Sequence, residues 1–222
     1  MKVKLVGYTQ PAKDFEEDFN NALDLIAYCA RVSNPSNQFN STTAEKLIRY
    51  LVNHKHWSPL EMASATLEIE TTRDIARQII RHRSFSFQEF SQRYADPNDL
   101  DNSFVLREAR LQDTKNRQNS IETNDEELKK AWLFKQSQII HEAKLAYKWA
   151  IENGIAKEQA RAVLPEGNTV SKLYMNGTLR SWIHYIELRS ANGTQKEHIE
   201  VAKAVANAIA NIFPMTHEFV DD

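Results

Sequence analysis

Arginines gather in one short stretch of the sequence. Residues 73–93 hold five of the 13 arginines together with His82, against only two acids, Asp74 and Glu89. Arginine is used there in preference to lysine. A planar guanidinium binds a phosphate or a carboxylate through two parallel hydrogen bonds, which the point charge of lysine cannot do. The stretch therefore indicates a binding site for anionic ligands.

The local periodicity suggests how this stretch is arranged. We expect a helix over residues 72–82, which places Arg77 and Arg81 four residues apart on one polar face. Asp74 and Gln78 lie on the same face. The alternative is a solvated helix face followed by a buried strand, a common outcome for charged clusters that bind nothing.

Glycine usage excludes the usual phosphate-binding loops. The chain has 5 glycines, where about 15 would be expected at ordinary usage. The closest pair, Gly167 and Gly177, is ten residues apart. Neither a G-x-G-x-x-G loop nor a Walker A loop can therefore be formed, so side chains must hold any phosphate.

The spacing within the stretch is that of a known family signature. Arg81-His82-Arg83, seven residues, Ser91, one residue and Arg93 match the pattern RHR-x7-S-x-R. Five fixed residues would occur by chance in a chain this long on the order of once in ten thousand. The chain resembles the flavin-dependent thymidylate synthases. The resemblance extends through Gln78, Glu89, the turn His56-Trp57-Ser58-Pro59, the segment ARAVLPE at 160–166 and the segment from Arg180 to Arg189.

The resemblance implies a reaction and its partners. Members of the family bind FAD, are reduced by NADPH, take a one-carbon unit from methylenetetrahydrofolate and convert dUMP to dTMP. The cofactors carry the chemistry, so the protein has to hold several molecules in register. The family is typically a homotetramer whose sites are shared between subunits, and the same assembly is implied here.

The resemblance also implies roles for individual residues. Catalytic roles fall on Arg189, His56 and Ser91. Contacts with FAD fall on Ser58, Arg81, His82, Arg83, Glu89, Thr178, Arg180 and His184. Contacts with dUMP fall on Gln78, Arg81, Glu89, Ser91, Arg93, Arg161 and Arg189. The chain departs from the family pattern at Thr178, where many relatives carry asparagine, which puts one hydrogen bond to the flavin in question.

Two residues resemble nucleophiles without the setting that a nucleophile needs. Ser91 would require a base within hydrogen-bond reach, and the sequence offers none. We interpret Ser91 as a hydrogen-bond donor to the substrate. Cys29 lies near the apolar positions Ile26 and Ala30 and is expected in the core. The cysteine-dependent thymidylate synthases are therefore an unsuitable comparison.

The histidines upstream do not predict a metal site. His54 and His56 form an H-x-H pair, but no third ligand follows at a matching spacing. The resemblance places His56 near the flavin and the folate. Ser58 is expected to cap a brief helix whose N-terminus suits an anion.

Arg189 is singled out by its position on a helix. At 100° per residue, Trp182, Tyr185 and Ile186 share one face, and Arg189 falls in the middle of it. The opposite face carries Arg180, His184 and Glu187. A guanidinium on an apolar face either extends past the helix end or meets a specific partner. The resemblance places it against the uracil ring.

The remaining elements follow from periodicity and caps. We expect strands at 2–9, 63–71, 104–107 and 170–175, and helices from Phe15 to Ala30, from the capping box Thr42/Glu45 to Asn53, from Thr123/Glu126 to Asn153-Gly154, near Ala160, and on both sides of Asn192-Gly193. Residues 108–122 are ambiguous. The strands do not alternate with helices, so the fold class is α+β, a mostly helical single domain over residues 1–222 with a small, largely antiparallel sheet.

Composition limits the alternative functions of the arginine-rich stretch. Lys+Arg 28 against Asp+Glu 30 gives a formal net charge of -2, so no overall basic excess is available for nucleic acid or an anionic membrane. Basic and aromatic residues alternate over 73–94, which leaves an RNA or single-stranded nucleic-acid binding module as the alternative function. A helical assembly protein that uses Trp132 and Trp149 is a third possibility, but it does not explain the arginines.

No signal peptide or membrane-spanning stretch is apparent, and Cys29 is the single cysteine. A cytoplasmic location is therefore predicted.

Overall fold

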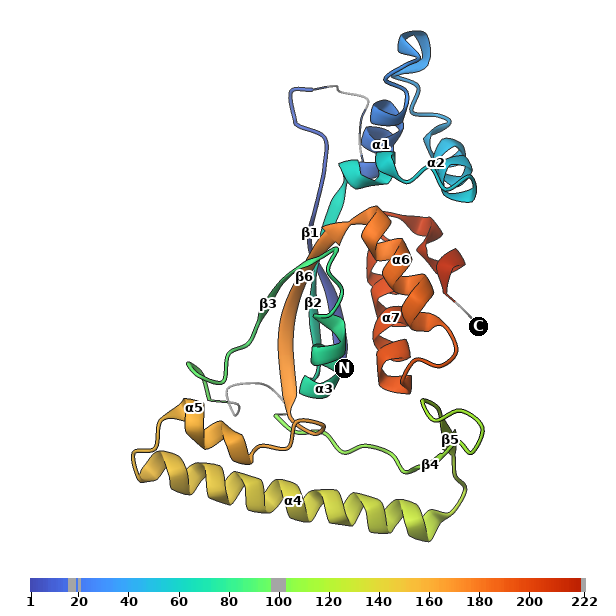
Figure 1. Cartoon of the computed structure of the whole chain (residues 1–222). Coiled ribbons are helices and arrows are strands. Elements are labelled where there is room, and N and C mark those ends of the chain that lie inside the picture. Colours follow the sequence, from blue (N-terminus) through green and yellow to red (C-terminus); the bar gives the residue numbers. More distant parts are fainter. Residues whose placement is uncertain (16–18, 20, 97–102, 221–222) are drawn as a thin grey trace.

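The computed structural model describes residues 1–15, 19, 21–96 and 103–220 (Figure 1). The strands are β1 (Lys2–Tyr8), β2 (Ser64–Thr72), β3 (Ser86–Glu89), β4 (Arg110–Gln112), β5 (Ser120–Glu122) and β6 (Val170–Thr178). The α-helices are α1 (Ala22–Ala30), α2 (Ala44–Asn53), α3 (Arg73–Ile79), α4 (Glu126–Glu152), α5 (Lys157–Ala160), α6 (Leu179–Ser190) and α7 (Lys196–Ile209). Short 3-10 turns are η1 (Pro35–Asn37), η2 (Ser58–Met62), η4 (Arg161–Val163) and η5 (Pro214–Phe219).

Four strands form the central sheet in the order β1-β2-β6-β3. All three neighbouring pairs are antiparallel, with Leu67 opposite Met175 in the β2/β6 pair. Side chains of β2 alternate between buried and half-buried positions, as a strand with one covered face requires. The predicted α+β class with a small antiparallel sheet is confirmed.

Helices α6 and α7 cover one face of the sheet (Figure 1). Leu67 and Leu173 of the sheet pack there against Trp182 and Val205, all fully buried. The other face is polar, and Tyr174 donates a hydrogen bond to Glu68 at 2.8 Å on it. The sheet therefore presents an apolar surface to the two helices that follow it in the chain.

The main core draws on both ends of the chain, from Leu5 and Ile26 to Phe213 and Met215. This supports one domain over residues 1–222, which stays a prediction. Among the described residues, no helix is long and apolar enough to cross a membrane.

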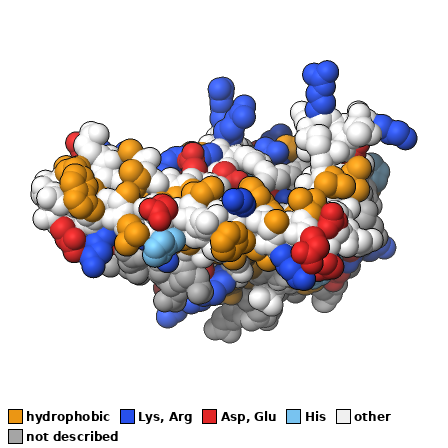
Figure 2. All heavy atoms as spheres, turned by 90° about the horizontal axis from the view of Figure 1, so that it is seen from below, with side chains coloured by type: hydrophobic (Ala, Val, Ile, Leu, Met, Phe, Trp, Pro, Cys, Tyr) orange, Lys and Arg blue, Asp and Glu red, His pale blue; other side chains and the backbone are white. Residues whose placement is uncertain are grey.

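Helix α4 is the longest element, at 27 residues, and lies across the far end of the sheet (Figure 1). Ile140 and Tyr147 are buried toward the rest of the protein. Phe134, Leu145 and Trp149 are 61%, 50% and 60% exposed. Figure 2 shows this face of the molecule, with hydrophobic side chains spread along it. The helix therefore leaves an apolar surface uncovered in the single chain.

Several boundaries differ from the sequence-based expectations. Helix α3 ends at Ile79, so Arg81 does not stand on one helical face with Arg77. Residues 104–107 form no strand, because only Phe104 makes an isolated bridge, to Thr169. The ambiguous segment 108–122 contains the β4/β5 hairpin. Helix α1 starts at Ala22 rather than Phe15, and of the expected first turns, residues 16–18 and 20 lie outside the described residues.

The predicted N-caps are also shifted. The α4 cap is Asp125, whose carboxylate accepts from the Leu128 N–H at 3.0 Å, while Thr123 accepts from the Asp125 N–H. Thr43 rather than Thr42 precedes α2 and makes no side-chain cap, while the Thr42 hydroxyl donates to the side chain of Asn40. At the C-terminal end of α4 the prediction is confirmed, with Asn153 as the cap and Gly154 at φ +77°, a conformation that favours glycine.

Candidate active site

The arginine-rich signature lies in the loop that joins α3 to β3. Because α3 ends at Ile79, Arg81 and Arg83 leave the helix and are exposed. Their side chains make no ion pair or hydrogen bond within the described residues. His82 lies between them and is half-buried. The loop thus holds two unpaired guanidinium groups beside one inward-facing imidazole.

His82 contacts Arg189, which lies 107 positions further along the chain near the end of α6. The Nε–H of Arg189 donates to Nε2 of His82 at 2.8 Å. Burial, and then the charge of Arg189, lower the pKa of His82 to about 4. The imidazole is therefore neutral near pH 7 and carries its proton on Nδ1. Of the two outcomes left open for Arg189, solvent or a specific partner, the structure shows a partner within the chain, His82.

The contact leaves most of the Arg189 fork available. A guanidinium has five N–H donors, and only Nε–H is engaged within the described part of the chain. The two terminal amino groups thus remain able to bind an anion side by side.

A second group of predicted residues meets around Glu158. Nε of Arg93 lies 3.5 Å from the Glu158 carboxylate, and Nε–H of Arg161 donates to the backbone carbonyl of Glu158 at 3.3 Å. The Ser91 hydroxyl accepts from the Arg93 N–H at 3.4 Å. The hydrogen bond from the Arg93 N–H is the described contact of this hydroxyl, so its role as a donor to substrate stays a prediction. Ser91, Arg93 and Arg161 therefore come together at one end of β3.

A third group joins η2 to α6. Arg180 forms an ion pair with Glu61, and the His184 ring lies 4.5 Å from the Trp57 ring between centroids. Thr178 is the N-cap of α6 and accepts from the Ser181 N–H at 3.3 Å. Ser58 is the first residue of η2, preceded by Trp57, and caps nothing with its side chain, so the predicted cap was wrong.

His56 is exposed beside η2, and its ring lies 6.2 Å from that of His54. Its backbone N–H donates to the Leu51 carbonyl at 2.8 Å. Within the described residues, no three His, Cys, Asp or Glu side chains are grouped to hold a metal ion. Cys29 is half-buried and lies outside the core clusters, so its expected core position was wrong. Burial still raises the pKa of its thiol, which disfavours a thiolate nucleophile.

Comparison with known proteins agrees with this arrangement. The sequence model of a family described as "Thymidylate synthase complementing protein" matches residues 16–215. The chain is 48% identical over 221 residues to a probable flavin-dependent thymidylate synthase of Paramecium bursaria Chlorella virus 1, covering 100% of this chain and 99% of the relative. This chain belongs to the flavin-dependent thymidylate synthase family.

Other similarities support the assignment to flavin-dependent thymidylate synthases. The chain is 45% identical over 214 residues to the flavin-dependent thymidylate synthase of a Synechocystis strain, covering 96% of each chain. Among solved structures it is similar to a UMP/dUMP methylase, PolB of Streptomyces cacaoi, bound with 5-Br dUMP. The TM-score is 0.79 at 27% identity, over 98% of this chain and 93% of that one. The resemblance indicated by residues 81–93 is confirmed.

Glu89 links the thymidylate synthase signature to α3 and β6. The Ser171 hydroxyl donates to Glu89 at 2.8 Å, and guanidinium nitrogens of Arg77 and Arg73 lie 3.4 and 3.7 Å from its carboxylate. Burial lowers the pKa of Arg73, Glu89 opposes the shift, and the charges of Arg77 and Arg161 add to it. The expectation that Arg77 and Arg81 act from one helix face is replaced by a cluster in which Arg77 pairs with acids.

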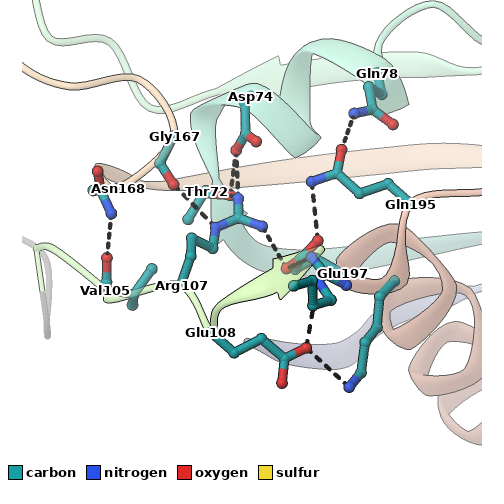
Figure 3. A network of polar contacts seen from close by, with 12 residues as sticks. Thr72, Asp74, Gln78, Val105, Arg107, Glu108, Gly167, Asn168, Gln195 and Glu197 are labelled. Atoms are coloured by element: carbon teal, nitrogen blue, oxygen red, sulfur yellow. Dashed lines mark hydrogen bonds and ion pairs between the residues drawn. The ribbon is translucent and has the colours of Figure 1, made fainter. Parts of the chain in front are cut away.

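Arg107, Gln195 and Glu197, which the sequence analysis did not single out, form a polar network with Asp74 and Gln78 (Figure 3). Arg107 donates to Asp74 and to the Gly167 carbonyl, and it pairs with Glu197 at 3.0 Å. Gln195 donates to Glu197 at 2.9 Å and accepts from Gln78 at 2.8 Å.

The sequence carried little indication of this network. Arg107 and Glu197 belong to segments without a recognisable motif or an unusual residue pattern. His198, which contacts Gln78 at 3.1 Å, is a polar residue on the apolar face of α7 with Val201 and Ala202, and that exception to the pattern was the available clue.

Proposed function

We propose that this chain catalyses the reductive methylation of dUMP to dTMP, with methylenetetrahydrofolate as carbon donor and NADPH-reduced FAD as hydride source. The observation that carries the proposal is the hydrogen bond between Arg189 and His82. It brings the end of α6, part of the Arg180 to Arg189 segment that also resembles the family, next to the signature loop, which supports one site built from both segments.

The side chains in the loop fit a flavin nucleotide. Arg81 and Arg83 are exposed and unpaired within the described residues, which suits the two phosphates of FAD. The rest of the cofactor would be contacted by His82, Arg180, His184 and Thr178. Ser58 and Glu89 would contact the edges of the cofactor. FAD supplies the hydride when bound, and the protein's part is to hold it.

The group around Glu158 suits the phosphate of dUMP. Arg93 and Arg161 provide two guanidinium groups, and Ser91 provides a hydroxyl. The ion pair between Arg93 and Glu158 is about half exposed on both sides, at 54% and 50%, so it is worth on the order of 0–1 kcal/mol. A phosphate with two negative charges can therefore replace Glu158 as the partner of Arg93.

Arg189 then has a chemical role. C5 of uracil becomes nucleophilic as negative charge develops on the imide, and a fixed guanidinium fork stabilises that charge. Neutral His82 holds the fork in place from the Nε side without competing for the two terminal amino groups. Gln78 and Glu89 would complete the contacts with dUMP, and His56 would lie near the flavin and the folate.

We also propose a homotetramer with sites shared between subunits. Phe134, Leu145 and Trp149 are exposed on one side of α4. Hydrophobic side chains are spread over this face of the molecule (Figure 2), and exposed apolar faces mark interfaces between proteins. Arg81 and Arg83 point to the same conclusion, because a second copy can complete a site that one chain leaves open.

The test is to add FAD to the purified protein, record the visible absorption spectrum, and measure dTMP formation with dUMP, methylenetetrahydrofolate and NADPH. We expect bound flavin and turnover that stops when any one component is omitted. Matched reactions without each component are the controls.

Protein that ignores FAD and makes no dTMP, yet binds oligonucleotides with a steep salt dependence, would favour the nucleic-acid alternative for residues 73–94. That alternative is not favoured by the family assignment.

A further inference from the structure

His198 is a fully buried polar residue that the proposed reaction leaves without a role. It lies on α7, and both of its ring nitrogens are engaged. Nε2 lies 3.0 Å from the Tyr185 hydroxyl, and Nδ1 lies 3.1 Å from Oε1 of Gln78. One imidazole thus connects a residue of α6 to a residue of α3.

The direction of each hydrogen bond around Gln78 follows from what the groups can do. The Glu197 carboxylate only accepts, so Gln195 gives it an N–H and turns its own carbonyl oxygen toward Gln78. Gln78 must therefore present its amino group to Gln195 and its carbonyl oxygen to His198. Burial alone would raise the pKa of Glu197, but hydrogen bonds and charges from Arg110 and Arg107 lower it to about 2, so the carboxylate stays ionised.

The same logic sets the tautomer of His198. A carbonyl oxygen only accepts, so Nδ1–H of His198 donates to Gln78. Burial, followed by the charges of Arg189 and His82, lowers the pKa of His198 to about 3. The ring has one proton near pH 7, and Nε2 accepts from the Tyr185 hydroxyl. The chain of hydrogen bonds from Tyr185 to Glu197 then runs in one direction.

Gln78 keeps half of its hydrogen-bonding capacity. Of its two N–H groups and two carbonyl lone pairs, the described residues engage one of each. We propose that His198 is a positioning residue, which holds the Gln78 amide in the single orientation that presents the remaining N–H and lone pair to dUMP. The inference rests on the proposed function, in which Gln78 contacts that substrate.

The position of Tyr185 supports a link to the reacting end of the site. Its ring lies edge-on to the His82 ring, with 5.0 Å between centroids, and His82 accepts from Arg189. Because His198 also accepts from the Tyr185 hydroxyl, the same imidazole contacts Gln78 directly and is linked through Tyr185 to the His82–Arg189 pair.

Two substitutions separate the two sides of the imidazole. In His198→Asn the amide nitrogen falls near the Nδ1 position, so a donor to Gln78 is kept and the contact with Tyr185 is lost. In His198→Gln the amide reaches the Nε2 position, so an acceptor for Tyr185 is kept and the donor to Gln78 is lost. Each variant thus serves as the matched control for the other.

The measurements are dUMP binding to the FAD-loaded protein by titration calorimetry and kcat at saturating dUMP. We expect His198→Gln to weaken dUMP binding by about fivefold, the size of one net hydrogen bond, and His198→Asn to bind close to wild type. Thermal unfolding is recorded for both, because a purely structural role would weaken binding in step with the loss of stability and would not distinguish the two amides.

A double-mutant cycle with Gln78→Ala completes the test. If His198 acts through Gln78, His198→Gln adds no further loss once Gln78 is gone. Equal weakening by both amides, additive losses in the cycle, or unchanged dUMP binding in His198→Gln and Gln78→Ala would each overturn the positioning role. Wild-type protein that binds no dUMP at all would instead contradict the proposed function.

Discussion

Arg189 is half-buried in the last turn of α6, on its apolar face, and a single hydrogen bond to His82 accounts for its described side-chain contacts. Helical position alone left two outcomes, an extended side chain in solvent or a specific partner. The structure shows the partner. The neutral imidazole accepts Nε–H without adding charge, and that leaves the two terminal amino groups of Arg189 without a described partner.

Removal of the Arg189 fork is expected to affect the reaction far more than the fold. In Arg189→Ala we expect the protein to fold and bind FAD but to lose dTMP turnover by about 10²–10³, the usual effect of removing one preorganised donor. The measurement is kcat at saturating dUMP, with flavin content from the visible spectrum. Near-normal turnover would withdraw the catalytic assignment.

At the scale of elements, the junction between β6 and the signature loop is closely packed. A Cβ atom on Gly177 would lie 2.3 Å from Cδ1 of Phe85. The Phe85 ring is itself edge-on to buried Trp182, with 4.7 Å between centroids, so it has little freedom to move. Glycine at this position allows β6 to approach the loop that carries His82.

Gly177→Ala is therefore expected to destabilise the protein by about 1–3 kcal/mol, the usual cost of overpacking. The free energy of unfolding in urea gives the value. Gly7→Ala is the matched control, because nothing lies within 4 Å of the added Cβ in β1, and it should change stability by less than about 0.5 kcal/mol. Equal effects of the two substitutions would show that Phe85 yields easily.

At the scale of the whole molecule, α4 carries the surface through which copies of this chain are proposed to associate. At 100° per residue, Phe134, Leu145 and Trp149 lie opposite the buried side of the helix, which carries Ile140 and Tyr147. A lysine in a buried apolar interface has to lose its hydration without gaining a partner. The oligomeric state should therefore depend on this face.

Trp149→Lys is expected to shift the native mass from a tetramer toward smaller species, as measured by light scattering after gel filtration. Val32→Lys is the control, because Val32 is 69% exposed and lies outside α4. A tetramer that survives Trp149→Lys and separates on Val32→Lys would move the interface away from α4.

The pH dependence of stability is also a property of the whole fold. The pKa values of His82 and His198 are lowered to about 4 and about 3, from an ordinary value of 6.5. Between pH 6.5 and these lowered pKa values, the unfolded chain binds more protons than the folded protein does. The stability contributed by the two neutral imidazoles is therefore present above pH 6.5 and is lost as the pH falls toward 4. Fully buried His198 should account for about 2 kcal/mol of the loss at pH 5, and half-buried His82 for less.

Urea unfolding at pH 7 and pH 5 measures this loss. His198→Asn does not titrate in the window, so the difference in unfolding free energy between the two pH values should shrink by about 2 kcal/mol. His217→Asn is the control, because His217 is exposed in η5, outside the interface proposed on α4, and it should leave the difference unchanged. An unaltered pH dependence in His198→Asn would mean that this imidazole is protonated in the folded protein.

The sequence by itself determined the family and the positions of the main helices and of β1, β2 and β6, but not β3 or the β4/β5 hairpin. The spacing from Arg81 to Arg93 identified the family because covalent spacing is visible without a fold. The burial of β2 and of the apolar face of α6 followed from periods of two and 3.6 residues, which are local properties. Helix caps and ends were predicted less accurately, because neighbouring polar side chains compete for the same backbone N–H groups. At α4, for example, Asp125 is the cap in place of the predicted Thr123.

Only the tertiary structure decided which of these residues meet. Arg189 reaches His82 across 107 positions, and His198 reaches Gln78 across 120. Such contacts depend on the register of β2, β6 and β3 and on how α6 and α7 pack on the sheet, and no local pattern encodes them. The early end of α3 at Ile79, which frees Arg81 from the helix, is likewise set by where the chain must go to pair β3 with β6.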